Sequence, residues 1–275
     1  MKTITVEVRD DHLESLARTK PMTALAELVW NALDAEATEV RVAFEDNEMG
    51  GTDCIRVSDN GHGLSYDDAM LSFRNLGGSW KRVNPRTADR NRVMHGKYGK
   101  GRFRAFSLGN VSSWRSAYLD GAGVRVFSLS GNAARIGEFA VTDPSPAPDP
   151  ATGMTVEIAE VTDAAGLLRG VKAVEEFTNI FAPYLRQYPD TRIFFDGVPV
   201  DPASVEERAT VIDLGEMVSE NGDRMRAELL VVEWSKPGRR GVFLCDEDGF
   251  MRLNALPRLH FRGFSYSAYV KSAHV

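Results

Sequence analysis

Glu27, Asn31 and Asp34 stand at a spacing that could hold a metal–phosphate group and activate a water molecule. At 100° per residue, the three side chains share one narrow stripe of a helix, opposite its apolar stripe. An amide oxygen one turn from a carboxylate can ligate Mg²⁺, a cation that prefers oxygen ligands. The carboxylate can then orient and deprotonate a water beside a terminal phosphate. A solvated polar helix face shows the same spacing, so this group alone does not establish the chemistry.

A second group, Asp59–Gly63, directly follows the strand-like run Ile55–Val57. An aspartate at a strand end can accept a hydrogen bond from an exocyclic amine such as that of adenine. Gly61 and Gly63 permit positive φ and close backbone approach. A tight turn is the competing interpretation, because Asp-Asn-Gly favours turns. The acidic alternation and closing glutamate of a calcium-binding loop are absent, and we expect His62 to face solvent.

A third group of glycines and lysines precedes the apolar segment Phe103–Leu108, which we predict to be helical. Backbone N–H groups at a helix start can cradle an anion, and lysines add positive charge. The group is no P-loop, because Gly-Lys-Ser/Thr does not occur, and its glycine order is the reverse of the dinucleotide-binding fingerprint. A flexible hinge loop is the structural alternative. The members of this group are Gly96, Lys97, Gly99, Lys100 and Gly101.

The elements that must position these groups follow from apolar periodicity. Apolar residues recur at helical spacing over Met22–Glu36, with Leu25, Leu28 and Val29 on one face. A short helix is expected near Tyr66–Phe73 and a long one over Ala164–Tyr188. The expected strands are Val40–Phe44, Cys54–Val57, Val111–Leu119, Val124–Leu129, Ile136–Val141, Met154–Ile158, Arg192–Phe195, Ala227–Trp234, Gly241–Cys245 and Phe264–Val270.

This order of elements predicts an α+β fold: a two-layer α/β sandwich over residues 1–205, followed by a β-rich region over residues 206–275. The polar, aperiodic stretch Gly77–Val93 has the character of a functional lid. The proline-rich insert Asp143–Pro150 is predicted to be a surface loop or hairpin tip.

The bulk composition excludes several classes of protein. With 275 residues, 43% hydrophobic and 26% charged, the chain is an ordinary globular sequence, and its net charge of −6 argues against a wholly basic nucleic-acid surface. Cys54 and Cys245 lie far apart, which favours buried thiols in a reducing compartment over a metal site. No signal core or membrane-length apolar segment occurs, so we expect a cytoplasmic protein without a membrane partner.

Taken together and in order, the patterns Glu-x3-Asn-x2-Asp-Ala, Asp-x-Gly-x-Gly and Gly-x2-Gly-x-Gly resemble those of the GHKL ATPase superfamily (gyrase, heat-shock chaperone, histidine kinase and MutL). The resemblance covers about residues 1–160 and is closest to the MutL, MORC and chaperone side of the family. It implies a Bergerat-type sandwich that binds ATP and Mg²⁺. The run Gly77–Lys81 resembles the segment leading into the family's ATP lid, and residues 164–275 more weakly resemble a helix and the start of a transducer-type domain.

The resemblance implies a role for each matched residue. Glu27 is similar to the family's general base and Asn31 to its Mg²⁺ ligand. Asp59 resembles the carboxylate that hydrogen-bonds to adenine. Gly61 lies in the same loop, and Gly63 matches the glycine that lies behind the adenine ring. The residues matching the lid that covers the phosphates are Gly96, Gly99 and Gly101, with Lys97 and Lys100 as further phosphate-contacting candidates.

One position departs from the family pattern. The family often carries Gly-Thr at the strand beside adenine, whereas here Met154 separates Gly153 from Thr155. Neighbouring strand residues point to opposite faces, so Thr155 is a weaker nucleotide-binding candidate than Asp59.

Three functions are compatible with these features. The first is slow, Mg²⁺-dependent ATP hydrolysis that drives conformational change or homodimerisation. The second is an ATP-sensing module without turnover, and the third a histidine protein kinase. Kinases of this family carry asparagine where Glu27 stands, and His12 has no four-helix context. The protein or nucleic-acid client is not encoded in these motifs.

The C-terminal region adds an expectation about length. The β-rich region ends at Val275 before a transducer-type sheet would close, so we expect either the N-terminal piece of a longer protein or a shortened relative. In MutL-like and gyrase-like relatives that domain supplies a lysine to the γ-phosphate, and Lys236 and Lys271 are the candidates here.

Overall fold

The computed structural model describes residues 18–74, 87, 92, 101–218, 222–235, 241–246, 251–255 and 265–274. The chain divides into two compact units, one formed by residues 1–174 and 191–199 and the other by residues 175–190 and 200–275. Most of the expected lid, and Gly96, Lys97, Gly99 and Lys100, lie outside the described residues. In the described part, no helix is long and apolar enough to span a membrane.

The first unit is built on a nine-stranded sheet with the order β5-β4-β3-β7-β2-β1-β8-β9, in which β6 pairs with β4. Its pairs are antiparallel except for β1 and β8, which run parallel. The strands are β1 (Glu39–Asp46), β2 (Thr52–Asp59), β3 (Gly109–Asp120), β4 (Gly123–Asn132), β5 (Phe139–Val141), β6 (Ser145–Pro146), β7 (Gly153–Val161), β8 (Arg192–Phe195) and β9 (Val198–Pro199).

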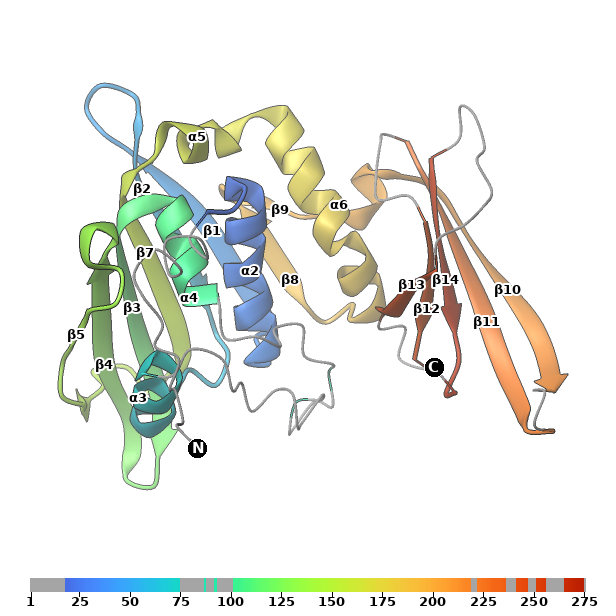
Figure 1. Cartoon of the computed structure of the whole chain (residues 1–275), viewed down its shortest axis with the longest axis horizontal. Helices are drawn as coiled ribbons and strands as arrows, with labels where there is room; N and C mark the ends of the chain where they lie inside the picture. The colour runs from blue at the N-terminus through green and yellow to red at the C-terminus, as the bar shows by residue number, and fades with distance from the viewer. Residues whose placement is uncertain are drawn as a thin grey trace, which may run out of the picture. The chain divides into compact units, whose positions relative to one another are not determined.

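Helices α2, α3 and α4 lie on one face of this sheet (Figure 1). The helical elements of the first unit are α2 (Pro21–Asp34), α3 (Tyr66–Arg74), α4 (Gly101–Arg104), α5 (Asp163–Gly166) and the 3₁₀ turns η2 (Ala105–Ser107), η3 (Ala133–Arg135) and η4 (Leu167–Arg169). Helix α2 begins with Pro21, whose fixed φ suits the first turn of a helix. Leu25, Val29 and Leu33 are 0–1% exposed, so the apolar stripe predicted for this helix forms the core.

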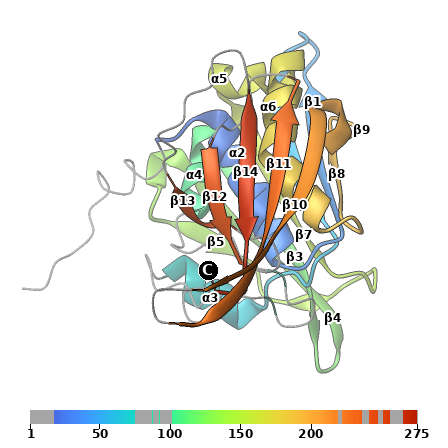
Figure 2. The ribbon, with the colours of Figure 1, turned by 90° about the vertical axis from the view of Figure 1, so that its right-hand side faces the viewer.

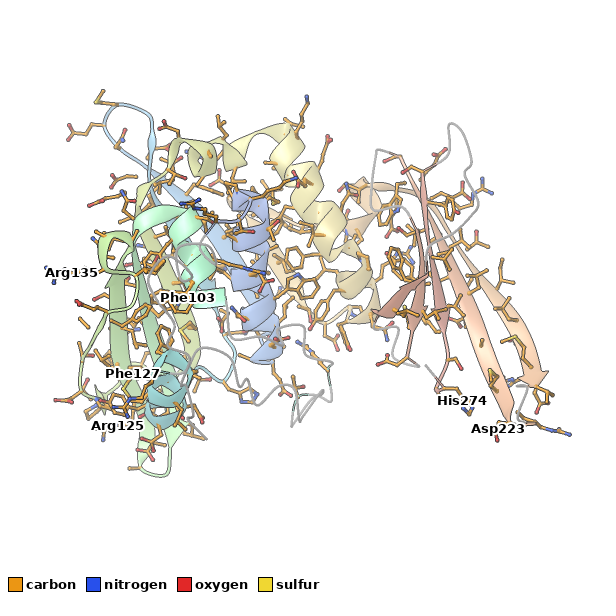
Figure 3. The ribbon with its side chains drawn as sticks, viewed as in Figure 1. Phe103, Arg125, Phe127, Arg135, Asp223 and His274 are labelled. Carbon is orange, nitrogen blue, oxygen red and sulfur yellow. The ribbon has the colours of Figure 1, made fainter. Side chains whose placement is uncertain are left out.

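The alternation of the central strands defines an inner face of the sheet, toward the helices, and an outer face. Ile55 and Val57 of β2 are buried, and they pair with Ile158 and Val156 of β7, which are also buried. Arg56, between Ile55 and Val57, is half-buried on the outer face. Aromatic packing continues the inner layer across β4, where Phe127 meets Tyr66 of α3 edge-on at 5.3 Å (Figure 3).

The second unit contains most of α6 (Val171–Gln187), the 3₁₀ turn η5 (Pro202–Ser204) and a five-stranded sheet. Figure 2 shows the strands in the order β10-β11-β14-β12-β13. Its core joins Ala182 of α6 to Trp234 and Phe243 of the sheet. The strands are β10 (Glu206–Val218), β11 (Arg224–Trp234), β12 (Gly241–Cys245), β13 (Met251–Ala255) and β14 (Tyr266–Lys271).

The predicted α+β sandwich followed by a β-rich region is confirmed. The single helix predicted over Ala164–Tyr188 is wrong: α5, η4 and α6 replace it, because Gly170 adopts an extended conformation with ψ 162°. The predicted strand over Ile136–Val141 is shortened by the preceding turn η3, and strands β6, β9, β10 and β13 were not predicted. The functional division of the chain at residue 205 stays a prediction.

The two thiols differ in their surroundings. Cys245 is buried, and burial raises the pKa of its thiol to about 12. Cys54 is only half-buried, so the expectation of two buried thiols is correct for Cys245 alone.

Candidate functional site

Glu27 lies in the middle of α2 and forms an ion pair with Arg104, the last residue of α4. The pair is semi-enclosed, with 26% of the Glu27 side chain and 29% of the Arg104 side chain exposed. Arg104 Nη1 donates to Oε1 of the carboxylate. Sequence reasoning missed this partner, because 77 residues separate the two positions.

The three polar residues of α2 have different environments. Glu27 is half-buried and Asn31, one turn later, is exposed. Asp34 is only 8% exposed, so the solvated face suggested by the spacing does not extend to it. Asn31 therefore presents an accessible amide beside a partly shielded carboxylate, an arrangement compatible with one protein ligand to Mg²⁺.

Asp59 ends strand β2, and the alternation of that strand places it on the inner face with Ile55 and Val57. Its Oδ1 accepts hydrogen bonds from the backbone N–H of Gly61 at 2.8 Å and of Met154 at 3.3 Å. Burial raises the pKa of this carboxyl to about 6, even though both backbone hydrogen bonds lower it. Both backbone hydrogen bonds use Oδ1, so Oδ2 is the atom with which this site can engage a ligand amine.

Gly61 and Gly63 let the loop after Asp59 pack against two backbone segments. A Cβ on Gly61 would lie 2.4 Å from the carbonyl oxygen of Ala35, just beyond α2. Gly63 has φ +69°, and a Cβ there would lie 2.2 Å from the carbonyl oxygen of Ala117 on β3. These contacts require glycine for steric reasons. They also fix the loop, and with it Asp59, between α2 and the sheet.

Polar contacts reinforce the loop. The side-chain oxygen of Asn60 accepts from the backbone N–H groups of Thr38 and Glu39 at 2.9 and 2.8 Å. His62 is exposed as expected, but its Nε2 lies 2.9 Å from Oε2 of Glu36, a carboxylate that is only 3% exposed. This contact was not predicted, because it depends on Glu36 adopting φ +63° immediately after the helix.

The pairing of β7 with β2 shows on which face of the sheet Met154 and Thr155 lie relative to Asp59. Thr155 pairs with Ser58, so both lie on the outer face. Met154 shares the inner face with Asp59 and donates its backbone N–H to that carboxylate. The hydroxyl of Thr155 is thus on the opposite face of the sheet from Asp59.

Only part of the third group falls within the described residues. Gly101 begins α4, and the other glycines and lysines of the group lie outside. Arg92, within the expected lid segment, is 4% exposed and donates to the carbonyl oxygen of Ala37 at 2.7 Å. Of the two candidate transducer lysines, Lys236 is not described, and Lys271 lies 3.3 Å from Gln187 Oε1 within the second unit.

Two further observations bear on ligands. Among the described residues, no three His, Cys, Asp or Glu side chains gather to hold a metal ion. An open cavity of about 450 Å³ beside Gly131, Asn132 and Phe139 does not include Asp59 or Glu27. The chemistry of the motifs, rather than this cavity, identifies the candidate site.

Comparison with known proteins finds a family model and a set of relatives. Residues 19–144, a little under half of the chain, match the family described as histidine kinase-, DNA gyrase B- and HSP90-like ATPase. The DNA mismatch repair protein MutL of Acidobacterium capsulatum is 52% identical over 54 residues, 20% of this chain and 8% of that protein. MutL of Opitutus terrae is 39% identical over 94 residues, 34% of this chain and 13% of that protein. The chain thus matches only a small part of these relatives.

Proposed function

The chain contains a domain of the GHKL ATPase superfamily, on its MutL-like side, whose family model matches residues 19–144, and on this premise we propose that the domain binds ATP with Mg²⁺ and hydrolyses it slowly. The observation that carries the proposal is the position of Asp59: a carboxylate on the inner face of the sheet, in a loop held against the end of α2. That helix carries Glu27 and Asn31. The proposal therefore assigns adenine recognition to the loop after β2 and phosphate chemistry to α2, whose end that loop contacts.

Asp59 is proposed to accept a hydrogen bond from the adenine amine through Oδ2. Its Oδ1 already accepts two backbone hydrogen bonds, which fix the orientation of the carboxylate. Gly61 and Gly63 support the base through their close backbone packing. Because Thr155 lies on the outer face, it would act on the nucleotide only through its pairing with Ser58, and the adenine contact rests on Asp59.

Glu27 is proposed as the general base and Asn31 as the protein ligand of Mg²⁺. When bound, Mg²⁺ supplies neutralisation of the phosphate charges. Glu27 orients the attacking water and takes its proton, while Asn31 fixes the phosphates relative to α2. The glycines Gly96, Gly99 and Gly101, with Lys97 and Lys100, are proposed to cover and neutralise the phosphates from the start of α4.

We further propose that ATP promotes homodimerisation, as the resemblance to MutL implies. If the closed state associates more strongly, dimerisation must tighten ATP binding by the same factor. A client protein or nucleic acid would act downstream of this change, and the motifs do not specify it.

Two other functions remain as alternatives. An ATP-sensing module would use Asp59 and the phosphate loop but would not need Glu27. A histidine kinase is disfavoured because Glu27 stands where such kinases carry asparagine, and because the relatives reported above are MutL proteins.

Titration calorimetry with ATP and Mg²⁺, followed by phosphate release from wild type and Glu27→Ala, tests the proposal. We expect both proteins to bind ATP and only wild type to turn it over, since loss of a general base costs about 10²- to 10⁴-fold in rate. Asn31→Ala should lose the Mg²⁺-dependent part of binding. Absence of ATP binding by wild type would refute the function, and equal turnover by wild type and Glu27→Ala would favour a base other than Glu27.

A further inference from the structure

The ion pair between Glu27 and Arg104 connects the proposed general base to the element that follows the phosphate loop. Arg104 closes α4, a four-residue helix that begins at Gly101, the last glycine of the third group. Its Nη1 donates to Oε1 of Glu27 from a position that is 29% exposed. Among the described residues, Arg104 is the one that pairs with this carboxylate.

We infer that Arg104 is a positioning residue that orients the Glu27 carboxylate for catalysis. By occupying Oε1, the guanidinium leaves Oε2 to accept a proton from water. In the proposed reaction, the water oxygen bonds to the γ-phosphorus while its proton passes to Oε2. The bond from that phosphorus to the bridging oxygen of ADP breaks, and the oxygen leaves with the electron pair. This inference rests on the proposed ATP hydrolysis.

The chemistry of the pair favours orientation over simple attraction. A guanidinium is planar, and its fixed array of donors restricts the rotation of a carboxylate more than a lysine ammonium does. Glu27 is attached to α2 through three rotatable bonds, so a partner on α4 reduces the number of orientations open to it. A misplacement of a reacting group by about 1 Å can cost about 10²-fold in rate.

The location of Arg104 also links this orientation to the phosphate loop. Gly101 is both the end of the glycine motif and the first residue of α4, only three residues before Arg104. A purely structural brace between α2 and α4 is the competing role, and it predicts loss of stability rather than loss of turnover.

The test compares wild type, Glu27→Gln, Arg104→Met and Arg104→Lys, with Arg135→Met as the matched control. Arg135 is another ion-paired arginine of the first unit, 3.6 Å from Glu138, at a position well exposed to solvent (Figure 3). For each protein, kcat and KM for ATP, the affinity for a non-hydrolysable ATP analogue and Tm are measured.

We expect Arg104→Met to lower kcat about 10- to 100-fold while KM and analogue affinity stay within about threefold, because a residue acting through Glu27 contributes mainly in the transition state. Arg104→Lys should recover part of the rate, and Arg135→Met should match wild type. In the Glu27→Gln background, adding Arg104→Met should lower the residual rate no further.

Three results would overturn the inference. An unchanged or increased kcat in Arg104→Met would show that the ion pair is incidental or inhibitory. A parallel loss of analogue affinity would indicate direct phosphate contact, and a fall in Tm that accounts for the lost activity would indicate a structural brace. If wild type itself shows no Glu27-dependent hydrolysis, the proposed function fails first, and that result is separate from any effect of Arg104.

Discussion

Replacing Asp59 by asparagine should weaken ATP binding and at the same time stabilise the folded protein. The asparagine oxygen can still accept the backbone N–H groups of Gly61 and Met154 that now reach Oδ1 at 2.8 and 3.3 Å. The new amide NH₂ then replaces Oδ2 and faces the amine of adenine, donor against donor. An unmatched buried polar pair costs about 1–3 kcal/mol, which corresponds to a loss of affinity of roughly 5- to 150-fold.

The effect of Asp59→Asn on stability has the opposite sign, for an electrostatic reason. Burial raises the pKa of this carboxyl from 3.8 to about 6, so the folded state holds the proton more tightly than the unfolded state. Ionised Asp59 therefore destabilises the fold by on the order of 3 kcal/mol above about pH 6. The penalty disappears below about pH 4, where both states are protonated. Asparagine, which does not ionise, removes it.

Calorimetry at pH 7.5 and urea unfolding between pH 4 and 8 measure the two effects. Asp53→Asn is the matched control, because Asp53 lies on the same strand but is exposed. Asp53→Asn should bind ATP with wild-type affinity. The difference in its free energy of unfolding from that of wild type should not grow as the pH rises. Unchanged ATP affinity in Asp59→Asn would refute adenine recognition by this carboxylate. If Asp59→Asn is less stable than wild type at pH 7.5, the claim that burial makes the ionised Asp59 carboxylate destabilising is refuted.

Three other outcomes follow from the fold and the proposed function. Gly63→Ala should lower the free energy of unfolding by about 1–3 kcal/mol or more, because residue 63 has φ +69° and a Cβ there would lie 2.2 Å from the Ala117 carbonyl oxygen. Gly121→Ala is the control and should be tolerated, because a Cβ there would meet nothing within 4 Å. Equal effects of the two substitutions in urea unfolding would contradict this reasoning. Phe243→Ala should destabilise the second unit by about 3–5 kcal/mol, since the ring is 0% exposed, and a loss below 1 kcal/mol in thermal unfolding would disprove the role of its packing. Glu27→Ala with excess ATP and Mg²⁺ should sediment as a dimer at tens of micromolar, corresponding to a binding free energy near −6 to −8 kcal/mol, whereas a monomer would reject nucleotide-dependent association.

Local periodicity was sufficient to predict most of the regular elements. The apolar spacing of α2 is fixed by the 3.6-residue turn, and the core positions Leu25, Val29 and Leu33 are buried as that spacing requires. The strand-like run Cys54–Val57 likewise predicted β2, and in the structure its alternation buries Ile55 and Val57. Helix breaks were harder to predict, because the extended conformation of Gly170 depends on the path of the chain between α5 and α6.

The sequence also determined which chemistry to look for, because residue type and order are local properties. Glu27, Asn31 and Asp59 were candidates from their residue types and spacing, and the resemblance to the GHKL family implied their roles. Those roles as nucleotide-binding and catalytic residues remain to be tested. The family match over residues 19–144 supports the class of ligand.

Only the tertiary structure decided which residues surround those groups. Arg104 reaches Glu27 across 77 residues, and Met154 reaches Asp59 across 95, through the pairing of β2 with β7. The raised pKa of Asp59 arises from burial, which no local motif encodes. Contacts between distant segments depend on strand register and helix packing, which the whole chain sets together. For that reason the motif supplied the reacting groups, and the fold supplied their partners.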